Sequence, residues 1–197
     1  MHRAFYLAGW GWVAISAALV LRARSPALVT IEPPVAAPQV FAGSSAAEWF
    51  ARARPSCNDL EVAIRVRNDP APAGWEGAGY ASACWAIAGR IDDARSALLT
   101  LSEDERNAAA GIVFGVGHPI ADMGDDRAAG PIMRLVVEFQ PWNYMALYHA
   151  GMSYYALGES ELARTHLVEF LKLYDVGDGW TANAREVLHR LEREEGT

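Results

Sequence analysis

The side chains best suited to hold a metal ion are five histidines: His2, His118, His149, His166 and His189. None of them forms an HxxxH pair, lies beside a second histidine or belongs to an HExxH motif, the arrangements by which one helix supplies zinc ligands. The acidic cluster Asp122, Asp125 and Asp126 lacks the alternating oxygen ligands of a calcium loop and is typical of a helix start. The sequence therefore predicts neither a metal site nor a cofactor.

Motifs for phosphate binding and nucleophilic catalysis are missing as well. No GxGxxG, GxxxxGK[ST] or GxSxG sequence stands where a strand would lead into a helix. The 197 residues include 24 Asp and Glu against 17 Lys and Arg, so the net charge is -7, which argues against a general nucleic-acid binder. At 52% hydrophobic residues, the chain is too apolar to be disordered. We expect a folded protein that is not an enzyme and binds no nucleic acid.

The two cysteines, Cys57 and Cys84, belong to no CxxC or CxxCH motif, which excludes zinc-ribbon and c-type haem sites. If residues 59–67 and 75–88 form an antiparallel helical hairpin, residue 57 lies opposite about residue 85, and a disulfide becomes feasible. The alternative is that both are unrelated small core residues. A disulfide would favour an oxidising compartment, because such bonds rarely persist in bacterial cytoplasm.

Residues 4–21 carry no charge and, as a helix, would rise about 27 Å, close to the thickness of a bilayer core. A retained anchor is favoured over a cleaved signal peptide, since Arg22 and Arg24 stand where a cleavage site needs small residues. Charges flanking the segment nearly balance and do not decide its orientation. The residues expected at packing positions, against lipid or a partner helix, are Gly9, Trp10, Gly11 and Trp12.

The chain divides into three parts by composition. Residues 1–24 form the predicted transmembrane anchor, and residues 25–45 form a Pro/Ala-rich linker in which four prolines favour extended backbone. Residues 46–197 are Ala-rich with helical periodicity, and they form the predicted helical domain.

Three stretches of this domain align on Gly89, Gly124 and Gly158, which are 35 and 34 residues apart. In each stretch a glycine ends one helix and acidic residues begin the next. The last unit also places bulky, small and aromatic residues at regular positions: Leu147, Gly151, Tyr154, Ala163, Leu167 and Phe170. This unit resembles the tetratricopeptide repeat, a helical hairpin of 34 residues.

The resemblance extends to weaker units. The middle one matches through Val113, Gly117, Ile120, Ala129, Met133, Val136 and Pro141. The first is degenerate and matches through Ala78, Ser82, Trp85, Ala94, Leu98 and Leu101. His118–Pro119 departs from the pattern and is expected to kink or shorten its helix. The predicted fold is an all-α, tetratricopeptide-like α-solenoid of about three repeats, with a degenerate leading pair over 46–67 and a capping helix over 180–194.

The resemblance implies that partners bind through the first helix of each repeat. The inward residues are then Phe114, His118, Met145, Tyr148, Met152 and Tyr155. This set is aromatic and thioether-rich without a cation, which favours an apolar or aromatic partner segment over an acidic tail. The alternative is that Tyr148 and Tyr155 pack against neighbouring helices.

These features favour a non-catalytic structural or assembly subunit of a bacterial inner-membrane multiprotein complex, single-pass, with its soluble domain in the periplasm. Its partners would be other protein subunits, and lipid would contact residues 4–21. The alternative function is a free, membrane-anchored envelope adaptor that recruits peptide clients transiently.

Overall fold

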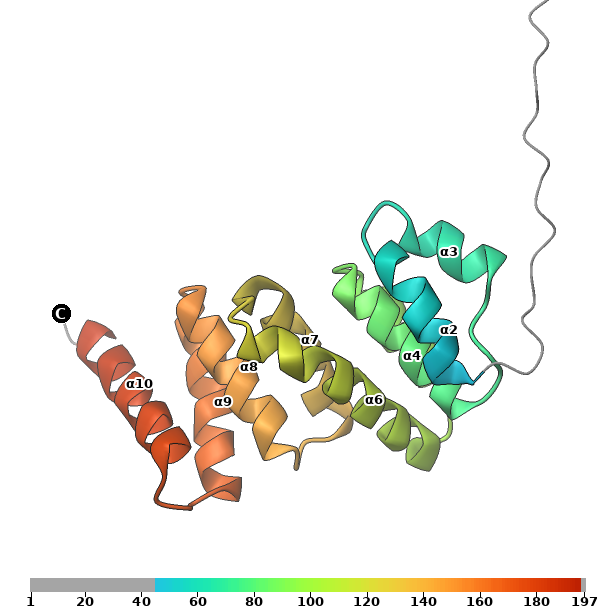
Figure 1. Ribbon diagram of the computed structural model, residues 1–197. Helices are drawn as coiled ribbons and strands as arrows, with labels where there is room; N and C mark the ends of the chain where they lie inside the picture. Colours follow the sequence, from blue (N-terminus) through green and yellow to red (C-terminus); the bar gives the residue numbers. More distant parts are fainter. Residues whose placement is uncertain (1–44, 196–197) are drawn as a thin grey trace, which may run out of the picture. The chain divides into compact units, whose positions relative to one another are not determined.

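The computed structural model describes residues 45–195, and every regular element among them is a helix. In chain order these are α2 (Ala46–Ala53), the short 3-10 helix η1 (Arg54–Ser56), α3 (Val62–Asn68), α4 (Trp75–Ile87), α5 (Ile91–Leu99), α6 (Glu103–Asp122), α7 (Asp126–Phe139), α8 (Tyr144–Ala156), α9 (Ser160–Leu173) and α10 (Gly179–Glu195). Figure 1 shows them following one another from α2 to α10. The predicted all-α class is confirmed for these residues, and their arrangement is compatible with an α-solenoid.

The three helical hairpins α4/α5, α6/α7 and α8/α9 share one turn geometry. Gly89, Gly124 and Gly158 have φ of 76°, 76° and 77°, a left-handed conformation that side chains other than glycine rarely adopt. In each hairpin the residue after the glycine donates its backbone N–H to a carbonyl five residues earlier, at 2.9, 3.2 and 2.9 Å. The predicted glycine turns are confirmed, and they explain the spacing of the three units.

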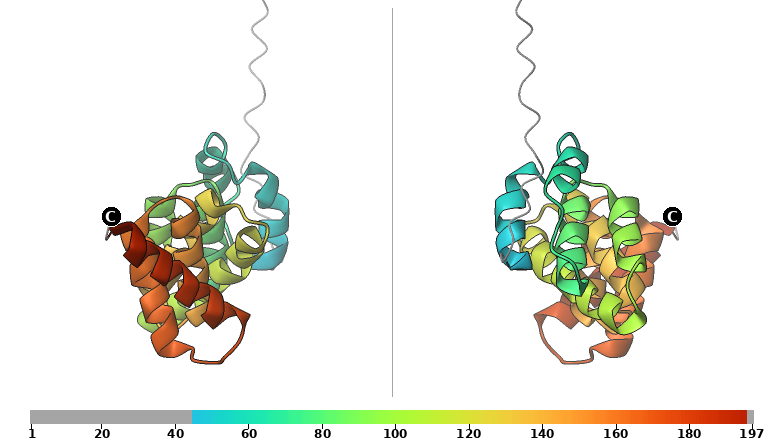
Figure 2. Two further views of the ribbon diagram at one scale, coloured as in Figure 1. Left: turned by 90° about the vertical axis from the view of Figure 1, so that its left-hand side faces the viewer. Right: turned by 90° about the vertical axis from the view of Figure 1, so that its right-hand side faces the viewer.

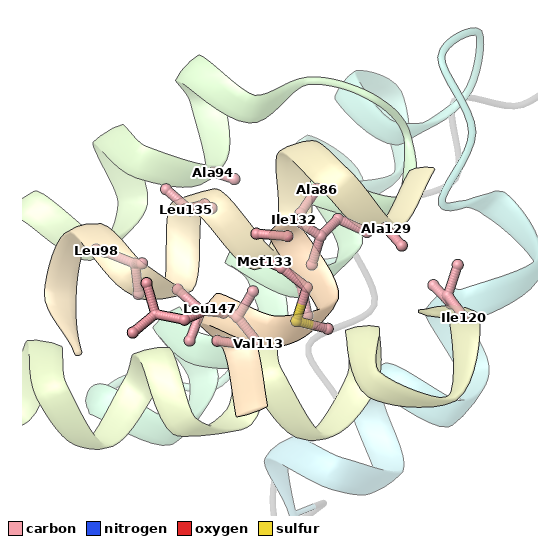
Figure 3. Packing of buried hydrophobic residues seen from close by; sticks show 14 of the residues in the cluster. Ala86, Ala94, Leu98, Val113, Ile120, Ala129, Ile132, Met133, Leu135 and Leu147 are labelled. Carbon is pink, nitrogen blue, oxygen red and sulfur yellow. The ribbon is translucent and has the colours of Figure 1, made fainter. Parts of the chain in front are cut away.

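Small residues let the two helices of a hairpin approach closely. A Cβ on Gly117 would lie 2.5 Å from Ile132 of α7, and a Cβ on Gly151 would lie 2.6 Å from Leu167 of α9. In the first hairpin Ser82 occupies the corresponding position, and its hydroxyl donates to the Ala94 carbonyl oxygen at 3.0 Å. The repeat residues predicted for the last two units are all buried except Pro141. Apart from the glycines, the buried ones belong to one hydrophobic cluster, of which Figure 3 shows residues between Ala86 and Leu147.

The leading segment packs on the first hairpin through α2. Ser45 caps this helix by accepting a hydrogen bond from the Glu48 N–H at 3.1 Å, while the Glu48 carboxylate accepts from the Ser45 N–H. Trp49 is buried, and its indole N–H donates to the Asp69 carbonyl oxygen at 2.8 Å. Phe50 stacks on Tyr80 of α4. The weak helix pair predicted over 46–67 therefore exists, as α2 and α3.

Helix α6 differs from the expectation for His118–Pro119. The helix continues through Pro119 and ends at Asp122, so the proline does not shorten it. A proline inside a helix cannot donate to the carbonyl four residues earlier. Here that carbonyl belongs to Gly115, which is an exposed residue, so water can replace the lost donor. The helix tolerates the proline because the lost hydrogen bond lies on its solvent side.

Helix α10 covers the last hairpin, as predicted for a capping helix. Ala184, Val187 and Leu191 are buried, and α10 contacts both α8 and α9. The left view of Figure 2 faces this end of the domain and shows α10 across the front of it. The apolar face that the last repeat would leave exposed is thus closed.

The anchor predicted over residues 4–21, with Gly9, Trp10, Gly11 and Trp12, lies outside the described residues, as does almost all of the linker. Among the helices between residues 45 and 195, none is both long and apolar enough to cross a bilayer.

Candidate partner-binding surface

The six residues predicted to bind a partner lie on two neighbouring helices, α6 and α8, which contact each other. All six side chains are half-buried: Phe114, His118, Met145, Tyr148, Met152 and Tyr155. Each therefore contributes to packing and also presents part of its surface to solvent. In the first hairpin the inward positions that the resemblance implies are small residues of α4, Gly79, Ala83 and Ala86, and all three are buried.

Aromatic rings connect α6, α8 and α10 in one row. Phe114 stacks on His118, with ring centroids 5.1 Å apart and planes at 24°. His118 meets His149 of α8 edge-on at 4.8 Å, and His149 meets Trp180 of α10 edge-on at 6.2 Å. We call these four residues the ring row. All four are half-buried, so the row crosses three helices and each of its side chains keeps some exposed surface.

The Tyr148 side chain packs against residues of α9 and α10 and does not project freely from the surface of α8. Its ring stacks on Trp180 at 5.1 Å and lies 5.1 Å from Phe170 of α9 at a tilt of 57°. The Asn183 side-chain amide donates to its hydroxyl at 3.4 Å. The sequence left open whether Tyr148 packs against neighbouring helices, and these contacts show that much of its side chain does so.

Tyr155 also meets α10. Hydrogen bonds to the Glu186 carboxylate and, second, to the Tyr155 hydroxyl raise the pKa of Arg190. Both tyrosines of α8, Tyr148 and Tyr155, are therefore in contact with the capping helix.

Two histidines and an aspartate come together beside the ring row. The Asp122 Oδ1 atom lies 3.8 Å from His118 Nε2 and 3.8 Å from His149 Nε2. Both Nε2 atoms are buried and have no hydrogen-bond partner. Burial and, second, the neighbouring His118 lower the pKa of His149, and Asp122 opposes this shift. These three residues are the described ones whose donor atoms could hold a metal ion.

Sequence reasoning missed this cluster because it considered spacing within one helix. His118 and Asp122 are four residues apart on α6, and His149 comes from α8. Aligning the units on their turn glycines places His118 six residues before Gly124 and His149 nine residues before Gly158. The two histidines therefore lie about one helical turn apart on corresponding helices. This small offset is the feature of the sequence from which their meeting could have been predicted.

The cysteines form a disulfide that joins the segment after η1 to α4. The sulfur atoms of Cys57 and Cys84 are 1.99 Å apart and the Cα atoms 4.9 Å apart. Both residues are buried in the core, where Phe50 and Tyr80 also stack. The pairing needs no helical hairpin of residues 59–67, because Cys57 lies in the turn that follows η1.

A separate cavity of about 280 Å³ lies where the start of α6 meets the end of α7. Its lining residues are Glu103, Arg106, Asn107, Glu138, Phe139, Pro141 and Trp142. None of the residues predicted to bind a partner lines it. The lining mixes acidic, basic and aromatic groups and so favours no single ligand chemistry.

Comparison of the chain with protein-family models, with curated proteins and with solved structures gives no match. The resemblance to the tetratricopeptide repeat therefore rests on the repeated residues themselves.

Proposed function

We propose that this chain is a non-catalytic assembly subunit of a bacterial inner-membrane complex, anchored by residues 4–21 and binding partner subunits through the α6–α8 surface. The observation that carries the proposal is the ring row, Phe114, His118, His149 and Trp180, which crosses three helices while half-buried. Aromatic side chains that are held rigidly and still partly accessible are the groups that most often supply binding energy in protein interfaces.

The neighbouring side chains suit the same role. Met145 and Met152 of α8 are half-buried, and a thioether adapts its shape to an apolar partner. The six predicted contact residues include no Lys or Arg. We therefore propose a partner segment that is apolar or aromatic rather than acidic.

Membership of the tetratricopeptide repeat family is part of the proposal. It is supported by three hairpins with equivalent glycine turns and by the close approach of α8 and α9 at Gly151. A periplasmic place for the domain is supported by the Cys57–Cys84 disulfide, because oxidising compartments maintain such bonds.

Co-purification of the full chain from its native membranes in mild detergent tests the proposal. A subunit should retain a partner at constant stoichiometry through the purification, whereas a transient adaptor should lose it. Phe114→Ala and Met152→Ala should each reduce the retained partner. Val168→Ala is the matched control, because Val168 lies on α9 and is exposed.

Circular dichroism of each variant should show unchanged helix content, so that a loss of partner reports on the surface and not on folding. Full retention by both the Phe114 and the Met152 variants would exclude the α6–α8 surface as the binding site. Complete loss of partner from the unmodified chain would favour the adaptor function.

A further inference from the structure

Three potential ligand atoms converge where the C-terminal turn of α6 meets α8. His118 and Asp122 lie on the same face of α6 because they are four residues apart. His149 reaches them from α8, and the ligand atoms of all three residues lie within 4.8 Å of one another. The side chain of His149 is only 12% exposed and that of His118 30%, so both imidazoles are held by packing.

The hydrogen-bonding groups of this cluster are not satisfied by the protein. The Nε2 atoms of His118 and His149 are buried without a partner, although buried polar atoms in proteins are nearly always hydrogen-bonded. At 3.8 Å, the Asp122 carboxylate oxygen is too far from either nitrogen for a hydrogen bond. Two buried nitrogens and a carboxylate therefore face a common point without bonding to one another.

A divalent transition-metal ion at that point would satisfy all three groups. Ligands about 2.0–2.1 Å from a tetrahedral zinc ion are about 3.3 Å apart. The two separations between Asp122 and the histidines, 3.8 Å each, exceed this by about half an ångström, and all three ligand atoms lie within 4.8 Å of one another. Rotations of the side chains would have to close these gaps. Imidazole nitrogen with one carboxylate suits zinc, whereas calcium and magnesium prefer oxygen ligands throughout.

We propose that His118, Asp122 and His149 bind one zinc ion, which joins α6 to α8. The side chain of Asp122 is 57% exposed, so the ion has a path from solvent and a fourth position open to water or to a partner side chain. The ion would fix α6 and α8, two of the three helices that the ring row crosses. The site shares His118 and His149 with the ring row, but zinc binding can be measured without a partner protein.

Zinc titration of the full chain tests the site. The protein is purified in detergent without a histidine tag, freed of metal with EDTA and dialysed, and zinc is then titrated in competition with a colorimetric chelator. One equivalent of zinc should bind. Loss of any ligand by His118→Gln, Asp122→Asn or His149→Gln should weaken binding at least about tenfold, since even the loss of an outer-shell partner has effects of that size.

Two controls separate this site from other histidines. His189→Gln removes an exposed histidine of α10, and His2→Gln removes a histidine that lies outside the described residues. Both should bind zinc as the unmodified chain does. Zinc should also raise the melting temperature of the unmodified protein and of both controls, but not of the three ligand variants.

Replacing a half-buried histidine could unfold the domain, whereas Asp122 is exposed and can be changed without unfolding it. A loss of zinc binding in Asp122→Asn therefore reports on the metal site and not on folding. Absence of stoichiometric binding would overturn the proposal. So would undiminished binding by all three ligand variants, loss of binding in His2→Gln alone, or equal competition by magnesium.

Discussion

Gly151→Ala and Gly115→Ala should change the free energy of unfolding in opposite directions, because the new methyl group meets Leu167 at residue 151 and nothing at residue 115. In Gly151→Ala the added Cβ would lie 2.6 Å from Cγ and Cδ2 of Leu167 and 3.2 Å from its backbone nitrogen. Leu167 is completely buried, so it has no free space into which to move. Such overpacking costs about 1–3 kcal/mol. The gain in helix propensity returns up to about 1 kcal/mol, which leaves a net loss of up to about 2 kcal/mol.

Gly115→Ala is the matched control on α6. A Cβ at this exposed position meets no atom within 4 Å, so only the gain in helix propensity remains. We expect it to stabilise the fold by up to about 1 kcal/mol. Thermal unfolding of the full chain in detergent, followed by circular dichroism at 222 nm, measures both. A change of 1 kcal/mol shifts Tm by about 2–4 °C in a protein of this size. If Gly151→Ala raised Tm as much as Gly115→Ala, the close approach of α8 and α9 would be refuted.

Three further predictions concern packing, the disulfide and pH. Tyr148→Ala should destabilise the domain by about 2 kcal/mol, less than for a fully buried ring, because it removes the stack on Trp180; thermal melting measures it. Alkylation of the denatured, unreduced chain should find no free thiol, and Cys57→Ser with Cys84→Ser should lower stability by up to roughly 3 kcal/mol. Burial lowers the pKa of His166 in the folded protein, so as the pH falls the unfolded state takes up a proton at this residue before the folded state does. The free energy of unfolding should therefore decrease as the pH drops below about 6.5. Urea titrations measure this decrease, which should be smaller in His166→Gln.

The hairpin turns were the part of the fold that the sequence predicted best. A glycine followed by acidic residues serves as a helix end and a helix start in any tertiary context, so Gly89, Gly124 and Gly158 could be assigned from local chemistry alone. The same holds for the small residue at Gly151, because a repeat must let its two helices touch. Local rules were sufficient wherever a residue acts within its own hairpin.

Contacts between units were harder to predict, because they depend on how one hairpin sits on the next. The partial covering of Tyr148 follows from where α10 docks, and Trp180 gives no local sign that it will stack there. The meeting of His118 with His149 likewise requires the offset between α6 and α8. The residues predicted for the partner surface lie together on α6 and α8, whereas the histidine cluster was not predicted.

The continuation of α6 past Pro119 is a local feature of one helix that also determines a contact between two units. A proline disfavours helical backbone at the residue before it, which here is His118, and that preference led to the expectation of a kinked or shortened helix. Because the helix persists to Asp122, His118 and Asp122 are one turn apart on a single face. A helix that ended at the proline would carry Asp122 away from this face, and the two imidazoles would meet without a carboxylate. The exposed position of residue 115, four residues before the proline, thus supports the proposed zinc site indirectly, by letting α6 continue to Asp122.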